Sequence, residues 1–275
     1  MASAPRKGQP RFIRGIAPGV HRLEHAYVNC YILEGRDGVT IVDAAFPSSW
    51  PHVSLALDSI GRAFSDVRAL VLTHAHFDHL GIAHRLAREY AVPAAVHPDD
   101  HRIAQHPYAY ARERTPFLYP LRYPKAIPIL AAMTFAGAIT VKGTNALESL
   151  PSQGPLDVPG SPEVIFTPGH TMGHCALRLP DSGALISGDA LVTLDPYKGT
   201  RGPQIIAGAA TADSAQALAS LDALVATEAE LVLPRTRRAV ARRHPLCCRR
   251  RTRRRANLTS APARGRARAR VPHVT

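Results

Sequence analysis

Three histidines and one aspartate lie within six consecutive positions of the segment THAHFDHLG, residues 73–81. Side chains two positions apart in an extended segment point to the same side, so we expect His74 and His76 to face one point. Asp78 and His79 follow where a helix is predicted to begin, and a helix N-terminus favours a carboxylate. Imidazole and carboxylate groups at this spacing indicate a metal site rather than a run of surface histidines.

Two later segments each place one further ligand-type residue just beyond a predicted strand. In TPGHTMGH, residues 167–174, a Pro-Gly turn after an apolar run leads to His170. In SGDAL, residues 187–191, an apolar run and a glycine lead to Asp189. Alone, either residue would be interpreted as a hydrogen-bonding side chain in a turn. Beside the first cluster, both become candidate remote ligands, because loops at strand ends carry function.

The elements that must position these side chains alternate between strands and helices. Helical spacing of apolar residues predicts helices at residues 50–60, 80–90 and 213–227. Strands and helices that alternate in this way share one α/β domain. Apolar runs predict strands at residues 20–23, 28–33, 39–42, 69–72, 93–96, 163–167, 175–179, 184–187 and 231–233.

A stretch rich in proline and aromatic residues, residues 107–150, interrupts this alternation. It predicts an insertion of helical turns and loops that covers the site. Its aromatic residues and the apolar run at residues 126–141 favour a pocket for a partly apolar acyl group. The alternative is that these side chains pack a core of the insertion itself. The candidate pocket residues are Tyr108, Tyr110, Phe117 and Tyr119.

The positive charge of the chain is concentrated near its C-terminus. The 275 residues carry a formal net charge of +13, and residues 235–275 hold 15 of the 34 Lys and Arg residues and none of the 21 Asp and Glu residues. We expect a flexible N-terminus at residues 1–11, one domain at residues 12–234, and a basic tail at residues 235–275 that is disordered or out of frame.

The N-terminus shows no apolar run of the kind found in signal peptides. The four cysteines form no metal-binding pair or disulfide framework. These features predict a cytoplasmic protein without a membrane partner.

In its motifs the sequence resembles the metallo-β-lactamase superfamily of hydrolases, over about residues 12–234. The matching segments are THAHFDHLG, TPGHTMGH and SGDAL, and residues 39–43 are similar to an early strand of the family that ends in aspartate. The resemblance implies an α/β fold, a four-layer αβ/βα sandwich with a two-metal site at one edge, to which this chain adds the helical and loop insertion.

The resemblance also implies which residues hold two divalent metal ions. Asp78 and His79 would hold the second ion, and Asp189 would bridge both. Zn²⁺ is favoured, and iron or manganese would suit the same ligands. The first ion would be held by His74, His76 and His170.

Two further residues, Asp43 and His174, would lie behind the ligands and orient them. The implied reaction is attack of a metal-bound hydroxide, oriented by Asp78, on an ester-type carbonyl of a small-molecule substrate, with thioesters and lactones favoured. One alternative is a nucleic-acid phosphodiesterase of the same fold, whose phosphate contacts a genuine arginine tail would supply. Another is a catalytically impaired remnant. The oligomeric state is left open.

The family pattern breaks at its last ligand, a histidine in a Gly-His-Gly turn after the final strand. Here Arg235, Thr236 and Arg237 follow that strand. One set of codons that is compatible with residues 235–240, followed by the first base of the next alanine codon, encodes Gly-His-Gly-Glu-Pro-Trp when read one base later. We therefore favour a change of reading frame at about Pro234 over a genuine basic tail. As printed, the chain is expected to bind the first metal ion well and the second poorly.

Sequencing the gene across the codons for residues 225–275 tests the reading-frame hypothesis. We expect the alternate frame, in which the Gly-His-Gly turn completes the site. A gene that encodes the printed residues would instead make the arginine tail a genuine feature and leave the second ion one ligand short.

Overall fold

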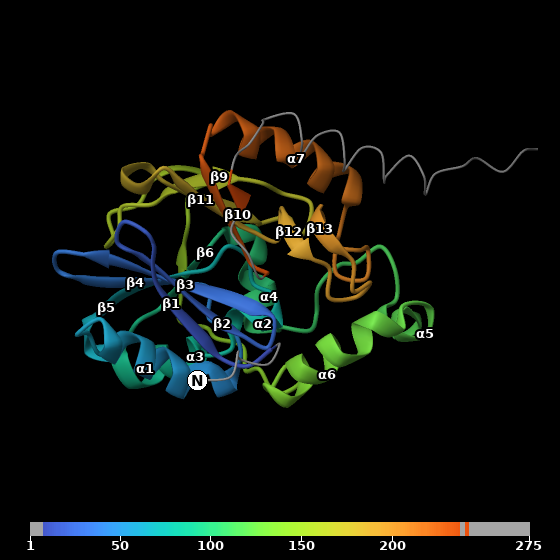
Figure 1. Cartoon of the computed structure of the whole chain (residues 1–275), viewed down its shortest axis with the longest axis horizontal. Helices are drawn as coiled ribbons and strands as arrows, with labels where there is room; N and C mark the ends of the chain where they lie inside the picture. Colours follow the sequence, from blue (N-terminus) through green and yellow to red (C-terminus); the bar gives the residue numbers. More distant parts are fainter. Residues whose placement is uncertain (1–7, 237–239, 242–275) are drawn as a thin grey trace, which may run out of the picture.

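The computed structural model describes residues 8–236 and 240–241, which form two β-sheets packed face to face with helices on the outer faces (Figure 1). Most of the tail predicted at residues 235–275 lies outside the described residues. The first sheet contains β1 (Arg11–Ala17), β2 (Val20–His25), β3 (Val28–Gly35), β4 (Gly38–Val42), β5 (Val67–Val71), β6 (Ala94–Val96) and β7 (Leu147–Ser149), in that order.

The second sheet has the order β15-β14-β11-β10-β9-β8, and β12 pairs with β13 in a separate ribbon. The bounds are β8 (Gln153–Pro155), β9 (Glu163–Phe166), β10 (Cys175–Leu179), β11 (Ala184–Gly188), β12 (Val192–Leu194), β13 (Arg201–Gln204), β14 (Leu231–Pro234) and β15 (Val240–Ala241).

Most helices are short, and no described helix is long and apolar enough to cross a membrane. The α-helices are α1 (Trp50–Ser59), α2 (Phe77–Leu80), α3 (Ala83–Tyr90), α4 (His101–Gln105), α5 (Tyr119–Arg122), α6 (Ile127–Phe135) and α7 (Ser214–Ala226). The 3₁₀ turns are η1 (Pro47–Ser49), η2 (Phe64–Asp66), η3 (Pro98–Asp100), η4 (Pro116–Leu118), η5 (Pro124–Ala126) and η6 (Pro180–Ser182).

Alternation of side chains along the strands produces the layers. In β3, Ile32 joins the core cluster that contains α1 and α3, whereas its neighbour Tyr31 joins the cluster between the two sheets. In β11, Leu185 packs with α7 and Ile186 joins the central cluster. Successive strand residues point to opposite faces, so both sheets are buried on two sides. The α/β class and the four-layer sandwich predicted from the sequence are confirmed.

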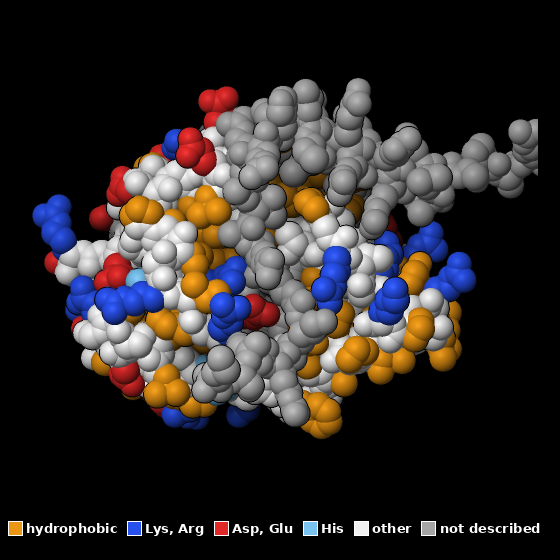
Figure 2. Space-filling model, viewed as in Figure 1, with side chains coloured by type: hydrophobic (Ala, Val, Ile, Leu, Met, Phe, Trp, Pro, Cys, Tyr) orange, Lys and Arg blue, Asp and Glu red, His pale blue; other side chains and the backbone are white. Residues whose placement is uncertain are grey.

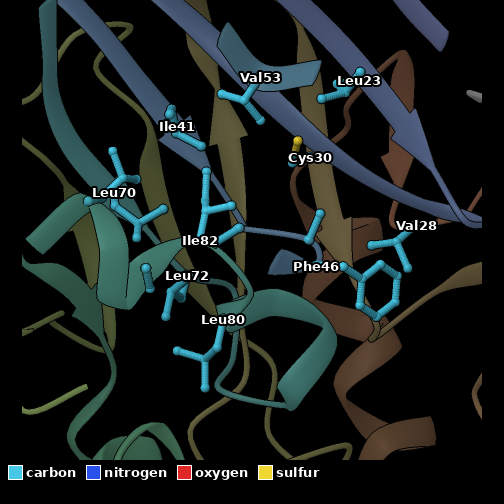
Figure 3. Packing of buried hydrophobic residues seen from close by; sticks show 14 of the residues in the cluster. Leu23, Val28, Cys30, Ile41, Phe46, Val53, Leu70, Leu72, Leu80 and Ile82 are labelled. Carbon is cyan, nitrogen blue, oxygen red and sulfur yellow. The ribbon is translucent and has the colours of Figure 1, made fainter. Parts of the chain in front are cut away.

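The outer cluster of the first sheet lies between its strands and the helices α1 and α3 (Figure 3). Val53 of α1 packs there with Ile41 of β4 and Leu70 of β5. The parallel pairing of β4, β5 and β6 brings their carboxyl ends to one edge of the sheet. Loops that leave this edge carry residues of the candidate site.

The helix predicted at residues 80–90 is interrupted, which differs from the expectation. Helix α2 ends at Leu80, and α3 begins at Ala83. The backbone N–H of Gly81 donates to the carbonyl of Ala45 at 3.0 Å instead of continuing a helix. A Cβ on Gly81 would come within 2.3 Å of the backbone of Phe46, so the loop after β4 approaches too closely for any other residue.

The insertion differs from the prediction in one respect, because its last residues form β7 beside β6. Its apolar side chains are partly exposed: Phe117 and Phe135 are 81% and 89% exposed. Figure 2 shows hydrophobic side chains gathered on the side of the molecule where α5 and α6 lie in Figure 1.

Helix α1 offers a matched test of the outer core layer. Leu57 is fully buried against the first sheet, whereas Leu55 on the same helix is 65% exposed. We expect Leu57→Ala to lower the free energy of unfolding by about 2–5 kcal/mol, since it removes buried methyl groups and leaves a cavity. Leu55→Ala should change it by less than about 0.5 kcal/mol. Urea unfolding of both variants measures the difference, and equal losses would contradict this packing.

Candidate metal centre

The candidate ligands leave the two sheets at the same edge. His74 and His76 follow β5 of the first sheet, whereas His170 follows β9 and Asp189 follows β11 of the second. Strands β9 and β11 both pair antiparallel with β10, so their carboxyl ends point the same way. The site therefore lies where the edges of the two sheets meet.

His74, His76 and His170 form one group that could hold a metal ion, and all three side chains are buried. His76 Nδ1 lies 3.0 Å from His170 Nε2. Two nitrogens bound to a tetrahedral zinc at about 2.05 Å are separated by about 3.3 Å. The spacing of this group therefore suits a metal ion between the rings.

Hydrogen bonds behind His74 fix the orientation of its ring. Its Nδ1 lies 3.2 Å from Thr73 Oγ1, and that hydroxyl lies 3.0–3.1 Å from both oxygens of Asp43. Because the Thr73 proton goes to the carboxylate, the hydroxyl accepts from His74 Nδ1 and the ring's lone pair lies on Nε2. The Asp43 carboxylate also lies 3.0 Å from His79 Nδ1. Asp43 thus stands behind two candidate ligands.

His170 is oriented in the same way from the second sheet. Its Nδ1 lies 3.2 Å from Thr211 Oγ1, whose proton goes to the carbonyl of Ile206 at 2.9 Å. The hydroxyl therefore accepts from Nδ1, and the lone pair on Nε2 faces the site. No local pattern in the sequence links Thr211 to His170, because the two residues lie 41 positions apart in the chain.

His174 positions Asp189 rather than joining the ligand groups. Its Nε2 accepts the backbone N–H of Asp189 at 3.0 Å, and its Nδ1 lies 2.8 Å from Thr167 Oγ1. Burial, together with the neighbouring His170, lowers the pKa of His174 to about 3. The ring is therefore neutral, as its acceptor role requires.

Several buried histidine nitrogens lack a hydrogen-bond partner in the described part of the chain, and this bears on whether the centre fits a metal ion. The Nε2 atoms of His74, His76 and His79 are buried without a hydrogen-bond partner among the described residues. Leaving a buried polar atom unpaired costs about 1–3 kcal/mol, so unpaired nitrogens in this cluster favour a bound ligand. Burial also lowers the pKa of His74 and His76, as do neighbouring histidines, which favours the neutral form that binds metals. The residues of the first group fit a divalent ion.

A second group, His74, His79 and Asp189, lies beside the first. In this second group, the positively charged side chain of Arg235 already lies beside the carboxylates. Arg235 Nη1 lies 3.0 Å from Asp189 Oδ2, and its Nη2 contacts Asp78 Oδ2. Asp78, which the family resemblance assigns to the second ion, is thus paired with a guanidinium.

The charges around the second group also oppose a second metal ion. Burial alone would lower the pKa of His79, but Asp43 and Asp189 raise it to about 10 and favour a proton on the ring. Burial lowers the pKa of Arg235 to about 9, partly offset by Asp43, so the guanidinium is charged at neutral pH. The second group therefore does not fit a metal ion as the first group does. The sequence showed only that a histidine was missing, not that an arginine enters the site.

The four candidate pocket residues are not all brought to the metal centre. The ring of Tyr110 lies 4.1 Å from that of His76, centroid to centroid. Tyr119 packs with Tyr197, in an apolar cluster that Tyr110 also contacts. Tyr108 uses its hydroxyl to bond the backbone of the insertion at residues 138 and 141, and the side chain of Phe117 is exposed.

Asp100, in η3 after β6, connects the two ligand loops and was not singled out from the sequence. Its Oδ2 accepts the N–H of Ala75 at 3.0 Å and the hydroxyl of Thr171 at 2.7 Å, and its Oδ1 accepts the N–H of Gly173 at 3.0 Å. Ala75 lies between two candidate ligands, and Thr171 follows a third. The signal in the sequence was a pair of aspartates just beyond a predicted strand.

We expect Asp100→Asn to weaken metal binding by about 10- to 100-fold, because an amide cannot accept all three hydrogen bonds and the two loops lose their common anchor. Asp99→Asn, at the adjacent and exposed position, is the matched control and should bind as the unaltered protein does. Titration with Zn²⁺ in the presence of a competing chelator measures both affinities. Equal affinities of the two variants would show that Asp100 does not hold the loops.

Known proteins with similar sequences include two that are named as probable metallo-hydrolases. The probable metallo-hydrolase YflN of Bacillus subtilis (strain 168) is 28% identical over 186 residues, which cover 66% of this chain and 67% of that protein. The probable metallo-hydrolase YqgX of the same strain is 27% identical over 124 residues, 45% of this chain and 49% of that protein. The chain thus spans about half to two thirds of the length of these relatives.

Solved structures show the same fold. The metallo-beta-lactamase family protein TTHA1429 from Thermus thermophilus superimposes with a TM-score of 0.60 at 24% identity, over 88% of this chain and 79% of that chain. TTHA1623, solved in a di-iron-bound form, gives a TM-score of 0.55 at 24% identity, over 82% of this chain and 93% of that chain.

The sequence profile described as Metallo-beta-lactamase superfamily matches residues 24–237. This range contains all the candidate ligands, and it ends within the segment where the expected ligand pattern breaks. With the sandwich fold and the buried histidine group at the meeting edges of its sheets, the chain belongs to the metallo-beta-lactamase superfamily, among its metallo-hydrolases.

Proposed function

We propose that this metallo-hydrolase cleaves an ester-type carbonyl, a thioester or a lactone with a partly apolar acyl group, at a metal ion held by His74, His76 and His170. The observation that carries the proposal is this buried histidine group, in which the Nε2 atoms of His74 and His76 have no partner among the described residues and the Nδ1 protons of His74 and His170 are held from behind. Three histidines that leave one position open form a catalytic rather than a structural ligand set.

When bound, the metal would lower the pKa of water and polarise the substrate carbonyl. Asp78 is the residue proposed to orient the attacking water and to accept its proton. Its Oδ2 contacts Arg235, which leaves Oδ1 for this role. Asp189 lies 3.3 Å from His170 Nε2 through its Oδ2, and its backbone is fixed by His174. This carboxylate would hold charge beside the reacting group without moving.

The preference for an apolar acyl group rests on the side chains next to the histidine group. Tyr110 packs against the ring of His76 and against the apolar cluster around Tyr197 and Ile206. Burial raises the pKa of Tyr110, so its hydroxyl stays neutral. An apolar surface of this kind suits a hydrocarbon chain better than a phosphodiester.

Zn²⁺ is the ion we propose for this site, because neutral imidazoles in a tetrahedral arrangement favour it. Iron is the main alternative, since the structural neighbour TTHA1623 was solved in a di-iron-bound form. The nucleic-acid alternative depended on the arginine-rich tail, which lies largely outside the described residues, and no described feature favours it.

A substrate panel on the zinc-loaded chain tests the proposed reaction. We expect turnover of thioesters or lactones, with kcat/KM increasing with the length of the acyl chain, and little turnover of phosphodiesters. Asp78→Asn should lower kcat by about 10²- to 10⁴-fold at unchanged zinc content, because the amide cannot accept the proton. Asp58→Asn, an exposed residue of α1, is the control and should leave kcat unchanged.

Two results would contradict this function. One is turnover of phosphodiesters alone, which would favour the phosphodiesterase. The other is the lack of any turnover by chains shown to hold zinc, which would favour the impaired remnant. His170→Ala should lose both zinc and turnover, and activity retained without zinc would place the reaction elsewhere.

A further inference from the structure

The backbone at the end of β14 is fixed on both sides of Arg235. The carbonyl of Pro234 accepts from Asn29 Nδ2 at 2.8 Å and from Tyr31 Oη at 2.6 Å. The N–H of Arg235 donates to the carbonyl of Gly188 at 3.3 Å, and its own carbonyl accepts from the N–H of Asn29 at 2.7 Å. Hydrogen bonds from both sheets thus hold this segment beside the metal centre.

The next residue, Thr236, is anchored toward β12. Its Oγ1 accepts the backbone N–H groups of Thr193 and Leu194, each at 3.0 Å. The side chain of Thr236 therefore points to the ribbon, and Arg235 is the residue of this turn that extends into the site. Its side chain is 3% exposed.

The guanidinium joins the two carboxylates that a second metal ion would use. Nη1 pairs with Asp189 Oδ2 and Nη2 with Asp78 Oδ2. The planar fork of arginine suits this bridge, because its two terminal nitrogens can each engage one carboxylate. Asp189 Oδ2 is also the atom that lies 3.8 Å from the Nε2 atoms of both His74 and His79.

A divalent ion that bound His74, His79 and Oδ2 of Asp189 would share that oxygen with the guanidinium. Two cations on one carboxylate oxygen repel each other, and in a buried site neither water nor salt screens them well. The arginine can leave only by breaking a buried ion pair with two carboxylates, which is strongly unfavourable. The first group shares no ligand atom with the guanidinium, because its ligand atoms are three imidazole nitrogens.

We propose that Arg235 is a built-in cation that takes the place of the second metal ion, so that this chain binds a single ion on the first group. The inference rests on the proposed function only in taking His74, His76 and His170 as the site of the bound ion. It concerns the polypeptide as printed, which carries Arg235. Asp78 and Asp189 are then bridged by a protein charge that does not dissociate.

Zinc stoichiometry tests the inference. The full chain and its variants are saturated with Zn²⁺, freed of excess metal by gel filtration and measured by elemental analysis, with calorimetric titration as a second readout. We expect about one ion per chain in the unaltered protein and about two in Arg235→Met, which keeps the length of the side chain but removes its charge. Arg235→Lys keeps the charge and should stay at about one.

Arg201→Ala, an exposed arginine of β13, is the control and should bind as the unaltered protein does. Circular dichroism verifies that each variant is folded, and Arg235→Gln replaces Arg235→Met if the latter is not. Zinc should also raise the melting temperature of the uncharged variant more than that of the unaltered protein, because it pairs two carboxylates left without a cation.

Two tightly bound ions in the unaltered protein would overturn the inference, and so would an uncharged variant that gains none. The proposed function fails differently. An unaltered chain that takes up no zinc contradicts the hydrolase, whereas the role of Arg235 is judged by the difference between that chain and the uncharged variant.

Discussion

The pairing of buried polar groups is the constraint on which this structure depends. Five histidines and several carboxylates are gathered in a region closed to water, and each must find a partner or a compensating charge. The protein meets most of this demand with hydrogen bonds from behind, through Asp43, Thr211 and His174. The atoms left without a partner among the described residues include the Nε2 nitrogens of His74, His76 and His79. The hydrogen bonds made by the surrounding residues therefore define the metal centre as much as its ligands do.

The sheets make this arrangement possible because they set the directions of the loops. Parallel neighbours bring strand ends to one edge, and the cluster between the sheets holds the two edges together. The histidines of the first group lie three to five residues beyond the ends of β5 and β9, and Asp189 directly follows β11, so each has little freedom. This is why local sequence motifs at strand ends suffice to identify a site assembled from segments almost a hundred residues apart.

Sequence patterns predicted the strands that are continuously apolar, since burial on both faces leaves a clear signal. Short edge strands such as β7 and β8 were missed, because three residues carry no readable period. In the site, the motif residues were predictable, whereas Asp100 and Arg235 were not. Their partners are 25 to 73 and 46 or more positions away in the chain, and no spacing rule spans such distances. The aromatic insertion shows the same limit: composition indicated a pocket wall, but only Tyr110 contacts a candidate ligand.

The position of Asp100 bears on how the two sheets are held together. One carboxylate holds the loop after β5 in the first sheet and the loop after β9 in the second. A metal on the three histidines would span the same junction, since two of them belong to the first sheet and one to the second. Ion binding and cohesion of the two halves are therefore thermodynamically linked. The metal centre would thus connect the two sheets at their interface. A substitution that changes the packing between the sheets should therefore alter the affinity for the ion.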